Sequence, residues 1–267
     1  MSVMFVTATT VLYLIGTALF LGSLLRRSEA WSQVSLGVTA VGFVSHTIAL
    51  AMRMMAAGHV PLTSFYEAMS FFSWALVVVF LWVEFRHRLH VLGAFILPIA
   101  SLSLLSAAAL PQESPALAPM LQTVWVHVTL SMLGAVGFAV AFVAGIMYLI
   151  QDGLLKSKRF NILNAKLPSL DFLDHLNQQS IVMGFPLLTL GIITGAISAQ
   201  IAGGSYLSWN PEQAGALVTW MFYFVVLMGR ITVGWRAKKA AYLTIIGFAG
   251  VVLTLIGVAL KGHGSIA

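Results

Sequence analysis

The chain has 267 residues, of which 60% are hydrophobic and only 8% are charged, against roughly 25% charged in soluble domains. So few charges exclude a soluble enzyme and a disordered chain, and the apolar residues suffice for about eight membrane spans of roughly 20 residues. The absence of cysteine excludes disulfides and thiolate metal sites in this chain, and the net charge of +6 does not indicate nucleic-acid binding, because the basic residues lie in short clusters between apolar runs.

Eight apolar windows with almost no charge follow one another along the chain. In the lipid hydrocarbon every backbone N–H and C=O must be satisfied within its own element, so each window is predicted to be a transmembrane helix. The windows are 3–24, 32–51, 68–83, 91–110, 121–150, 181–202, 214–228 and 240–260. The sequence therefore predicts an all-α fold, a polytopic membrane helix bundle that forms one integral membrane domain over residues 1–267.

Lysine and arginine favour the cytoplasmic loops of membrane proteins, and this preference predicts an orientation. If the N-terminus is outside, every lysine and arginine except Arg53 and Lys261 falls in an inner loop. The first window lacks a preceding basic segment and is followed by Arg26 and Arg27, so we expect a retained span rather than a cleaved signal peptide. The pattern predicts a multi-pass protein of a bacterial inner membrane with both termini on the outer, periplasmic face.

The longest inner connection, residues 151–180, separates the fifth window from the sixth. Its apolar positions Leu170, Leu173 and Leu176, with Phe172 beside them, favour one side of a helix. Such a pattern is typical of a short amphipathic helix on a membrane surface. The same segment is equally suited to docking a partner protein.

Histidine is the main side chain here that can bind a metal or titrate near neutral pH, and the chain has seven. His87, His90 and His175 belong to inner connections, where a solvated or interfacial role explains them. His46 lies inside the second window, and an ionisable group at membrane depth is a functional candidate by default. It fits two roles equally well, a hydrogen-bonded packing residue or a residue for cofactor binding or relay.

Three further histidines, His59, His127 and His263, are predicted on the outer side. Two neutral imidazoles on opposite faces of a porphyrin iron form a bis-histidine haem site, and three histidines allow three pairings. The outer loop 202–213 adds glycines, which permit close approach of a flat ligand, and the aromatic side chains of Tyr206 and Trp209. An ordinary outer turn with interfacial aromatic residues explains the same loop without a ligand.

Several stretches of the chain together resemble the cytochrome c assembly family of haem-handling membrane proteins, the CcsA, ResC and HemX group. Residues 61–67 (Pro-Leu-Thr-Ser-Phe-Tyr-Glu), followed by Ser73 and Trp74, resemble the outer-loop entry to the family's third span. Residues 184–196 are similar to the span that leads into the family's tryptophan-rich loop, and residues 234–241 are similar to its last inner loop. Their order and spacing hold over nearly the whole chain, which implies the family's fold.

The family's loop motif reads Trp-Gly-x-Tyr-Trp-x-Trp-Asp-Pro-Lys-Glu. This chain matches it at Gly204, Tyr206, Trp209 and Pro211, and departs from it elsewhere, for example at Leu207, where a tryptophan is expected. In the family this loop holds haem on the outer face. The resemblance therefore implies that these four matching residues contact a haem b, iron protoporphyrin IX.

The family's axial ligands are one histidine at the start of the fifth span and one after the last span. These positions match His127 and His263, so the resemblance selects this pair as ligands of the haem iron. It leaves His46 as a waypoint for haem within the membrane. Met228 takes the place of a seventh-span histidine, and methionine serves either as an axial ligand or as a flexible packing residue.

The resemblance implies that the protein handles or presents haem at the outer face during maturation of c-type cytochromes. It also implies a membrane partner of the CcsB or ResB type and an apocytochrome c, with ligase activity that belongs to the pair and not to this chain alone. A second hypothesis is a HemX-like regulator that docks glutamyl-tRNA reductase through residues 151–180, which the incomplete match of the outer loop to the family motif favours. A third is a transporter of another solute, which would need ionisable groups near the midplane. Only His46 and Glu67 are candidates, and Glu67 is expected near the outer surface, where Arg53 could pair with it.

Overall fold

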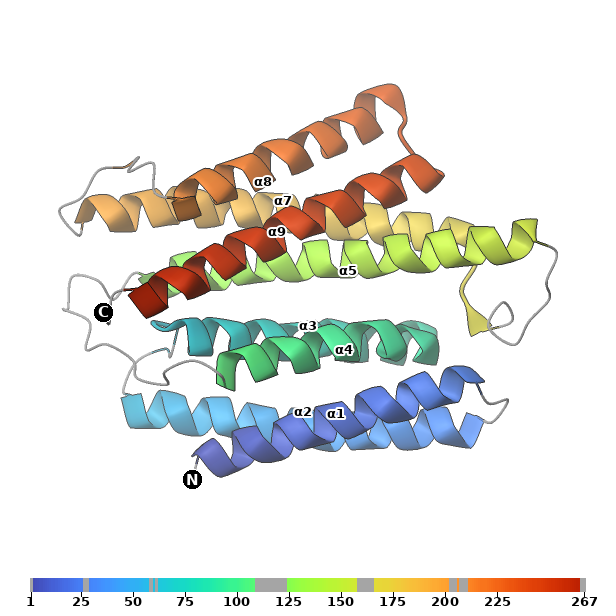
Figure 1. Cartoon of the computed structure of the whole chain (residues 1–267), viewed down its shortest axis with the longest axis horizontal. Helices are drawn as coiled ribbons and strands as arrows, with labels where there is room; N and C mark the ends of the chain where they lie inside the picture. The colour runs from blue at the N-terminus through green and yellow to red at the C-terminus, as the bar shows by residue number, and fades with distance from the viewer. Residues whose placement is uncertain are drawn as a thin grey trace. The chain divides into compact units, whose positions relative to one another are not determined.

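The computed structural model describes residues 2–25, 29–57, 60, 62–108, 124–157, 166–201, 206 and 211–264. Within them, eight helices are long and apolar enough to cross a membrane, one for each predicted window (Figure 1). They are α1 (Ser2–Leu25), α2 (Glu29–Ala57), α3 (Phe65–His87), α4 (His90–Ala108), α5 (Val124–Lys156), α7 (Leu170–Ile201), α8 (Pro211–Met228) and α9 (Ala237–Gly264). The predicted all-α membrane fold is confirmed, while the side on which the termini lie stays a prediction.

The helices belong to two compact units, each built from segments far apart in the sequence. Unit 1 comprises residues 1–61, 69–113 and 151–169, and unit 2 comprises residues 62–68, 114–150 and 170–267. Unit 1 thus holds α1, α2, α4 and most of α3, whereas unit 2 holds α7, α8, α9 and most of α5. The segments of the two units alternate along the chain, so no single cut in the sequence separates them, and the single membrane domain stays a prediction.

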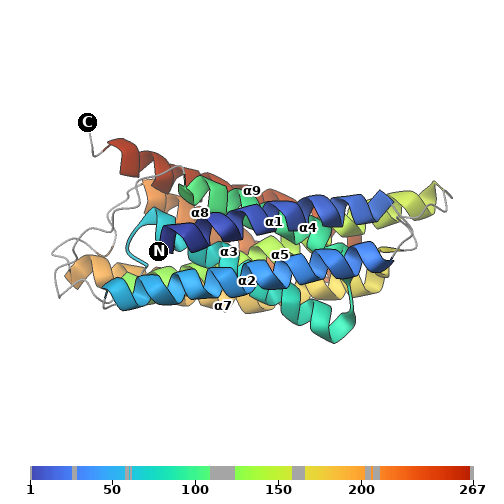
Figure 2. The ribbon, with the colours of Figure 1, turned by 90° about the horizontal axis from the view of Figure 1, so that it is seen from below.

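In unit 1 the helices approach one another where a small residue faces a large one. The helices α1 and α2 run antiparallel and side by side (Figures 1 and 2). A methyl group added at Gly42 would lie 2.9 Å from the ring of Tyr13, and one added at Gly93 would lie 2.8 Å from the ring of Phe20. Small residues at contact points are typical of helix packing in membranes. Helices in lipid gain no hydrophobic stabilisation from association, so close van der Waals contact between their backbones stabilises the packing instead.

The first turn of α3 is closed by a capping box, in which two side chains satisfy backbone groups at the helix start. The Glu67 Oε2 atom accepts hydrogen bonds from the backbone N–H of Thr63 at 2.8 Å and of Ser64 at 3.3 Å. The Ser64 Oγ atom accepts a hydrogen bond from the Glu67 N–H at 3.3 Å. This local role accounts for the buried carboxylate of Glu67, one of the two ionisable groups that the transporter hypothesis considers.

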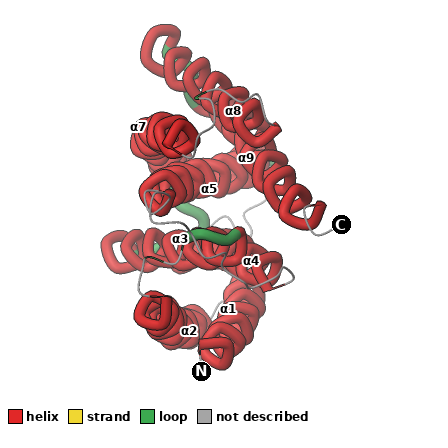
Figure 3. Tube along the Cα trace, turned by 90° about the vertical axis from the view of Figure 1, so that its left-hand side faces the viewer, coloured by secondary structure: helices red, strands yellow, loops and turns green. Residues whose placement is uncertain are grey.

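In unit 2 the helices α5 and α7 come close enough for glycine to be required. A methyl group added at Gly134 would lie 2.9 Å from the backbone nitrogen of Leu188, and one added at Gly137 would lie 2.9 Å from the Cα atom of Gly184. Figure 3 shows the four helices of this unit end-on. Because neighbours alternate in direction, α5 and α8 begin at the end of the unit where α7 and α9 finish (Figure 1).

The connection between α5 and α7 is shorter than predicted, because both helices extend beyond their apolar windows. The predicted short helix within residues 151–180 is not separate; residues 170–180 are the first turns of α7. Leu173 and Asn177 on these turns are buried, whereas His175 is exposed. The polar residues of this stretch therefore belong partly to the packed interior of unit 2.

Candidate functional site

His127 lies in the first turn of α5 and points its imidazole at the backbone of α7. Its Nδ1 atom is 2.6 Å from the carbonyl oxygen of Gly191, and Ser131 Oγ lies 3.5 Å from the same nitrogen. A carbonyl oxygen only accepts hydrogen bonds, so Nδ1 must carry the proton. In the neutral ring the Nε2 lone pair is then available to a metal, which is the tautomer that metal-binding histidines adopt.

Two glycines of α7 make room for this contact. A methyl group added at Gly195 would lie 2.6 Å from His127 Nδ1 and 2.7 Å from Cε1, and one at Gly191 would collide with Ser131. The Gly191 carbonyl also accepts a hydrogen bond from the Thr194 hydroxyl at 3.0 Å. The ring of His127 is therefore held both by a hydrogen bond and by the bare backbone of the facing helix.

The other predicted haem contacts are placed only in part. Tyr206 is 57% exposed, and Pro211 begins α8. Gly204 and Trp209 lie outside the described residues, as does the predicted outer histidine His59.

The last turn of α9 contains His263, whose side chain lies outside the described part of the chain. The end of α9 lies at the same end of unit 2 as the start of α5, with the ends of both helices facing the viewer in Figure 3. We call this the His127 end of unit 2. The backbone thus brings the two predicted ligand positions to one end of the same unit.

His46 lies in unit 1 and is fully buried. Its Nδ1 atom is 3.3 Å from the Tyr13 hydroxyl and its Nε2 atom is 3.0 Å from the Ser70 hydroxyl. Both ring nitrogens are therefore used within unit 1, and a metal would have to displace one of these hydroxyls. This geometry favours the packing interpretation over a relay, and the predicted role as a haem waypoint stays a prediction.

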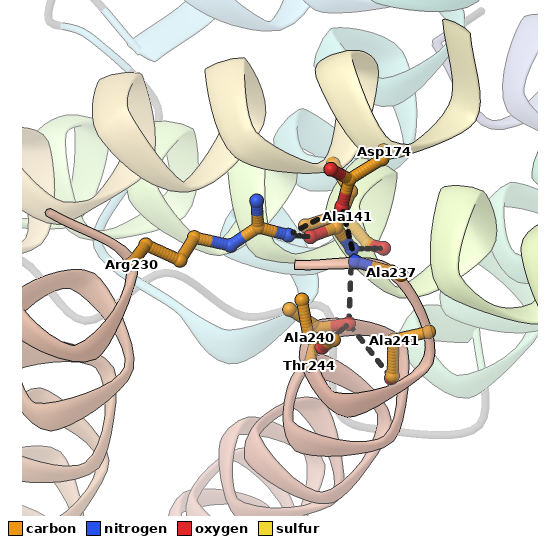
Figure 4. A network of polar contacts seen from close by, with 8 residues as sticks. Ala141, Asp174, Arg230, Ala237, Ala240, Ala241 and Thr244 are labelled. Carbon is orange, nitrogen blue, oxygen red and sulfur yellow. Dashed lines mark hydrogen bonds and ion pairs between the residues drawn. The ribbon is translucent and has the colours of Figure 1, made fainter. Parts of the chain in front are cut away.

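A polar network of mostly buried side chains lies at the other end of unit 2, where α7 begins and α8 finishes (Figure 4). The Arg230 guanidinium Nη2 donates to Asp174 Oδ1 at 3.3 Å and also to Asn177 Oδ1. The Asn177 amide donates to the Ala141 carbonyl at 2.6 Å and to Thr244 Oγ1 at 3.0 Å. We call this the Arg230 end; its network connects α5, α7 and α9 with the segment after α8.

The sequence did not predict this network, although one signal was present. Arg230 follows an apolar window after one residue, Gly229, and a basic residue at the end of a span either reaches the interface or is paired within the bundle. Asp174 and Asn177 were instead assigned to a surface helix.

Comparisons with known proteins agree with the predicted resemblance. A sequence profile of the family described as Cytochrome C assembly protein matches residues 62–266. The chain is 32% identical over 266 residues to the Cytochrome c biogenesis protein CcsA of Guillardia theta, an alignment that covers 92% of this chain and 88% of that protein. It is also 32% identical over 252 residues to the protein of the same name from Prochlorococcus marinus (strain NATL1A), which covers 82% and 79% of the two chains.

Among solved structures, the Cytochrome c Heme Lyase CcmF superposes on this chain with a TM-score of 0.67 at 16% sequence identity. The match covers 98% of this chain but 50% of CcmF, so the chain spans half the length of that protein. At this identity the likeness shows a shared fold.

Proposed function

The chain belongs to the cytochrome c assembly protein family, and from that premise we propose that it binds haem at the His127 end of unit 2 and presents it on the outer membrane face. Family membership assigns it a role in maturation of c-type cytochromes as a multi-pass membrane protein that handles haem. The finer statement is that the group is haem b and that His127 and His263 are the axial ligands of its iron.

The observation that carries this proposal is the hydrogen bond between His127 Nδ1 and the Gly191 carbonyl, at 2.6 Å. A ligating histidine commonly donates its other ring N–H to a carbonyl or carboxylate, which fixes the tautomer and raises the basicity of the free nitrogen. His127 has this arrangement. It differs from His46, whose two ring nitrogens both lie within hydrogen-bonding distance of hydroxyl groups.

The remaining parts of the proposed site come from segments that meet at the same end of unit 2. His263 on the last turn of α9 would supply the second imidazole. Tyr206, Gly204, Trp209 and Pro211 belong to the connection between α7 and α8, which starts and finishes at this end. When bound, haem would supply the iron and the porphyrin vinyl groups, while the protein holds and orients them.

The partners follow from the chemistry of attachment. A c-type cytochrome carries haem on thiols, and this chain has no cysteine, so the thiols must come from the apocytochrome c. We propose that the chain works with a CcsB- or ResB-like membrane partner and that the ligase activity belongs to this pair. The membrane is proposed to be the bacterial inner membrane.

The alternative, a HemX-like regulator that docks glutamyl-tRNA reductase, stays a prediction. The docking segment that it requires, residues 151–180, lies partly outside the described residues and includes the first turns of α7, where Leu173 and Asn177 are buried. Only the opposite side of these turns, with Asp171 and His175, is exposed. Leu170, Phe172 and Leu176 on the same turns are half-buried, so these turns offer such a partner a mixed polar and apolar strip.

The proposal is tested by loading the purified protein with haem and recording its absorption spectrum. We expect the low-spin bands of a bis-histidine haem, loss of these bands in His127→Ala and in His263→Ala, and their recovery when free imidazole is added. His175→Ala is the matched control, because this histidine is exposed on α7 of the same unit. An unchanged spectrum in the double variant His127→Ala/His263→Ala would refute ligation by this pair.

A further inference from the structure

The segment that carries Arg230 is irregular and firmly fixed. Residues Gly229–Val233 form a single π-helical turn after α8, a feature that occurs frequently at functional sites. The following Gly234 adopts a left-handed conformation with φ 74°, and the Trp235 N–H donates back to the Gly229 carbonyl at 3.0 Å. This turn holds the start of the Arg230 side chain in one place.

The next backbone contact also fixes the site. Ala237 has a φ of 58°, a conformation that costs roughly 1–2 kcal/mol for a residue with a Cβ atom. Its N–H donates to Asp174 Oδ1 at 3.2 Å. Strained backbone that is held in place by its surroundings is characteristic of binding sites.

Arg230 itself is buried and only partly satisfied. Its side chain is 2% exposed, and Nη2 is the nitrogen that meets Asp174 and Asn177. Among the residues that the structure describes, Nε and Nη1 have no hydrogen-bond acceptor, so three N–H bonds of a cation are left over. Burying such groups without a partner is costly, most of all for a charged side chain.

The charge around Arg230 selects the kind of partner. Within the described residues, Asp174 is the carboxylate paired with Arg230, and its oxygen is shared with the Ala237 backbone. The turn that follows adds Arg236, Lys238 and Lys239. Arg236 and Lys239 are exposed, so water screens their charges, whereas the buried Arg230 guanidinium has two nitrogens without an acceptor among the described residues. In surroundings of lower dielectric constant, that buried positive charge favours an anion over water.

We propose that the Arg230 end of unit 2 is a binding site for a phosphate oxyanion, with the headgroup of an anionic phospholipid as its source. Arginine is the preferred partner for phosphate because its planar N–H groups match phosphate oxygens. Basic pockets between transmembrane helices near the cytoplasmic surface bind anionic headgroups, and charge sorting predicts that this end faces the cytoplasm. The site is separate from His127, so it does not depend on haem binding.

The experiment compares wild-type protein with Arg230→Lys, which keeps the charge and removes the Nε and Nη1 donors. Delipidated protein in a neutral detergent is titrated with phosphatidylglycerol, with phosphatidylcholine and with inorganic phosphate against chloride of equal ionic strength. Thermal stability and native mass spectrometry report binding. We expect one tightly held phosphatidylglycerol on the wild type and about 10- to 100-fold weaker binding in Arg230→Lys, the range for loss of charged hydrogen bonds.

Arg236→Lys is the matched control, because Arg236 is exposed in the same basic turn and the change keeps its charge. Stabilisation by phosphatidylglycerol alone identifies the lipid as the source, and stabilisation by inorganic phosphate through Arg230 shows that the site also takes the free anion. Equal retention of lipid by wild type and Arg230→Lys, with no phosphate effect, would overturn the proposal. If Arg230→Lys does not fold, a wild type that binds phosphatidylglycerol no better than phosphatidylcholine overturns it instead.

Discussion

Gly195→Ala tests whether α7 sets the orientation of the His127 ring. The added methyl group would lie 2.6 Å from Nδ1 and 2.7 Å from Cε1, distances that are too short for a carbon atom against a non-bonded neighbour. The backbone of α7 is packed through glycine against α5, so the imidazole is the group that must move. Its rotation breaks the 2.6 Å hydrogen bond to the Gly191 carbonyl.

The size of the effect follows from these contacts. Overpacking by one methyl group costs about 1–3 kcal/mol, and the lost hydrogen bond adds about 1 kcal/mol. The higher helix propensity of alanine offsets about 1 kcal/mol of this loss in stability. We therefore expect a net loss of about 1–3 kcal/mol in the free energy of unfolding. Because His127 also loses the carbonyl that orients its ring, we expect about 10- to 100-fold weaker haem affinity.

The assay is haem titration followed by absorption, together with unfolding in detergent. Gly257→Ala on α9 is the control, since its added methyl group meets nothing within 4 Å, and it is expected to keep haem affinity and gain stability. The reduction potential of bound haem supplies a readout that simple destabilisation would not move. Wild-type haem affinity and potential in Gly195→Ala would refute the view that α7 positions His127.

Three further changes have defined outcomes in the same preparations. Asn177→Ala removes hydrogen bonds that join three helices and should lower the free energy of unfolding by about 2–4 kcal/mol; a loss below about 0.5 kcal/mol, typical of surface changes, would contradict the network. Ala237→Gly should raise that free energy by about 1 kcal/mol by relieving the left-handed conformation, whereas Ala240→Gly, inside α9, should lower it by a similar amount. His46→Ala should cost about 2–4 kcal/mol from lost hydrogen bonds and a cavity and leave the haem spectrum unchanged. Reduced haem loading at intact stability would instead support the waypoint.

The spans could be predicted because a membrane imposes one rule on every residue within it. Each apolar window had to satisfy its own backbone, and a helix is found at each of them. The ends could not be predicted by that rule, because polar residues at a helix end leave the hydrocarbon. The helix α5 therefore continues to Lys156, and α7 begins at Leu170. The rule for the hydrocarbon predicts a surface segment in this polar stretch, because it applies only to the apolar windows.

The candidate site could be predicted in its residue types but not in its contacts. A histidine near the start of a predicted span is visible in the sequence, whereas the carbonyl that fixes its tautomer belongs to Gly191, which has no side chain to indicate a role. The same holds at the other end, where Arg230 meets Asn177, a residue 53 positions earlier. Pairings of this kind depend on helix packing, which composition and periodicity do not determine.

The two proposed sites share α7, yet we expect a mutation at one site to leave ligand binding at the other unchanged. Asn177 and Gly191 are separated by about 20 Å along a helix with a rise of about 1.5 Å per residue. Between them, Gly184 is pressed against α5 and Pro186 interrupts the helix interior, where the backbone lacks a hydrogen bond and can bend. Displacement of α7 at the Arg230 end would be absorbed there before it reached the carbonyl that holds His127. The free-energy effects of mutations at sites this far apart, with no shared contacts, usually add independently. A result against lipid binding would therefore leave the haem proposal unaffected, and a result against haem binding would leave the lipid proposal unaffected.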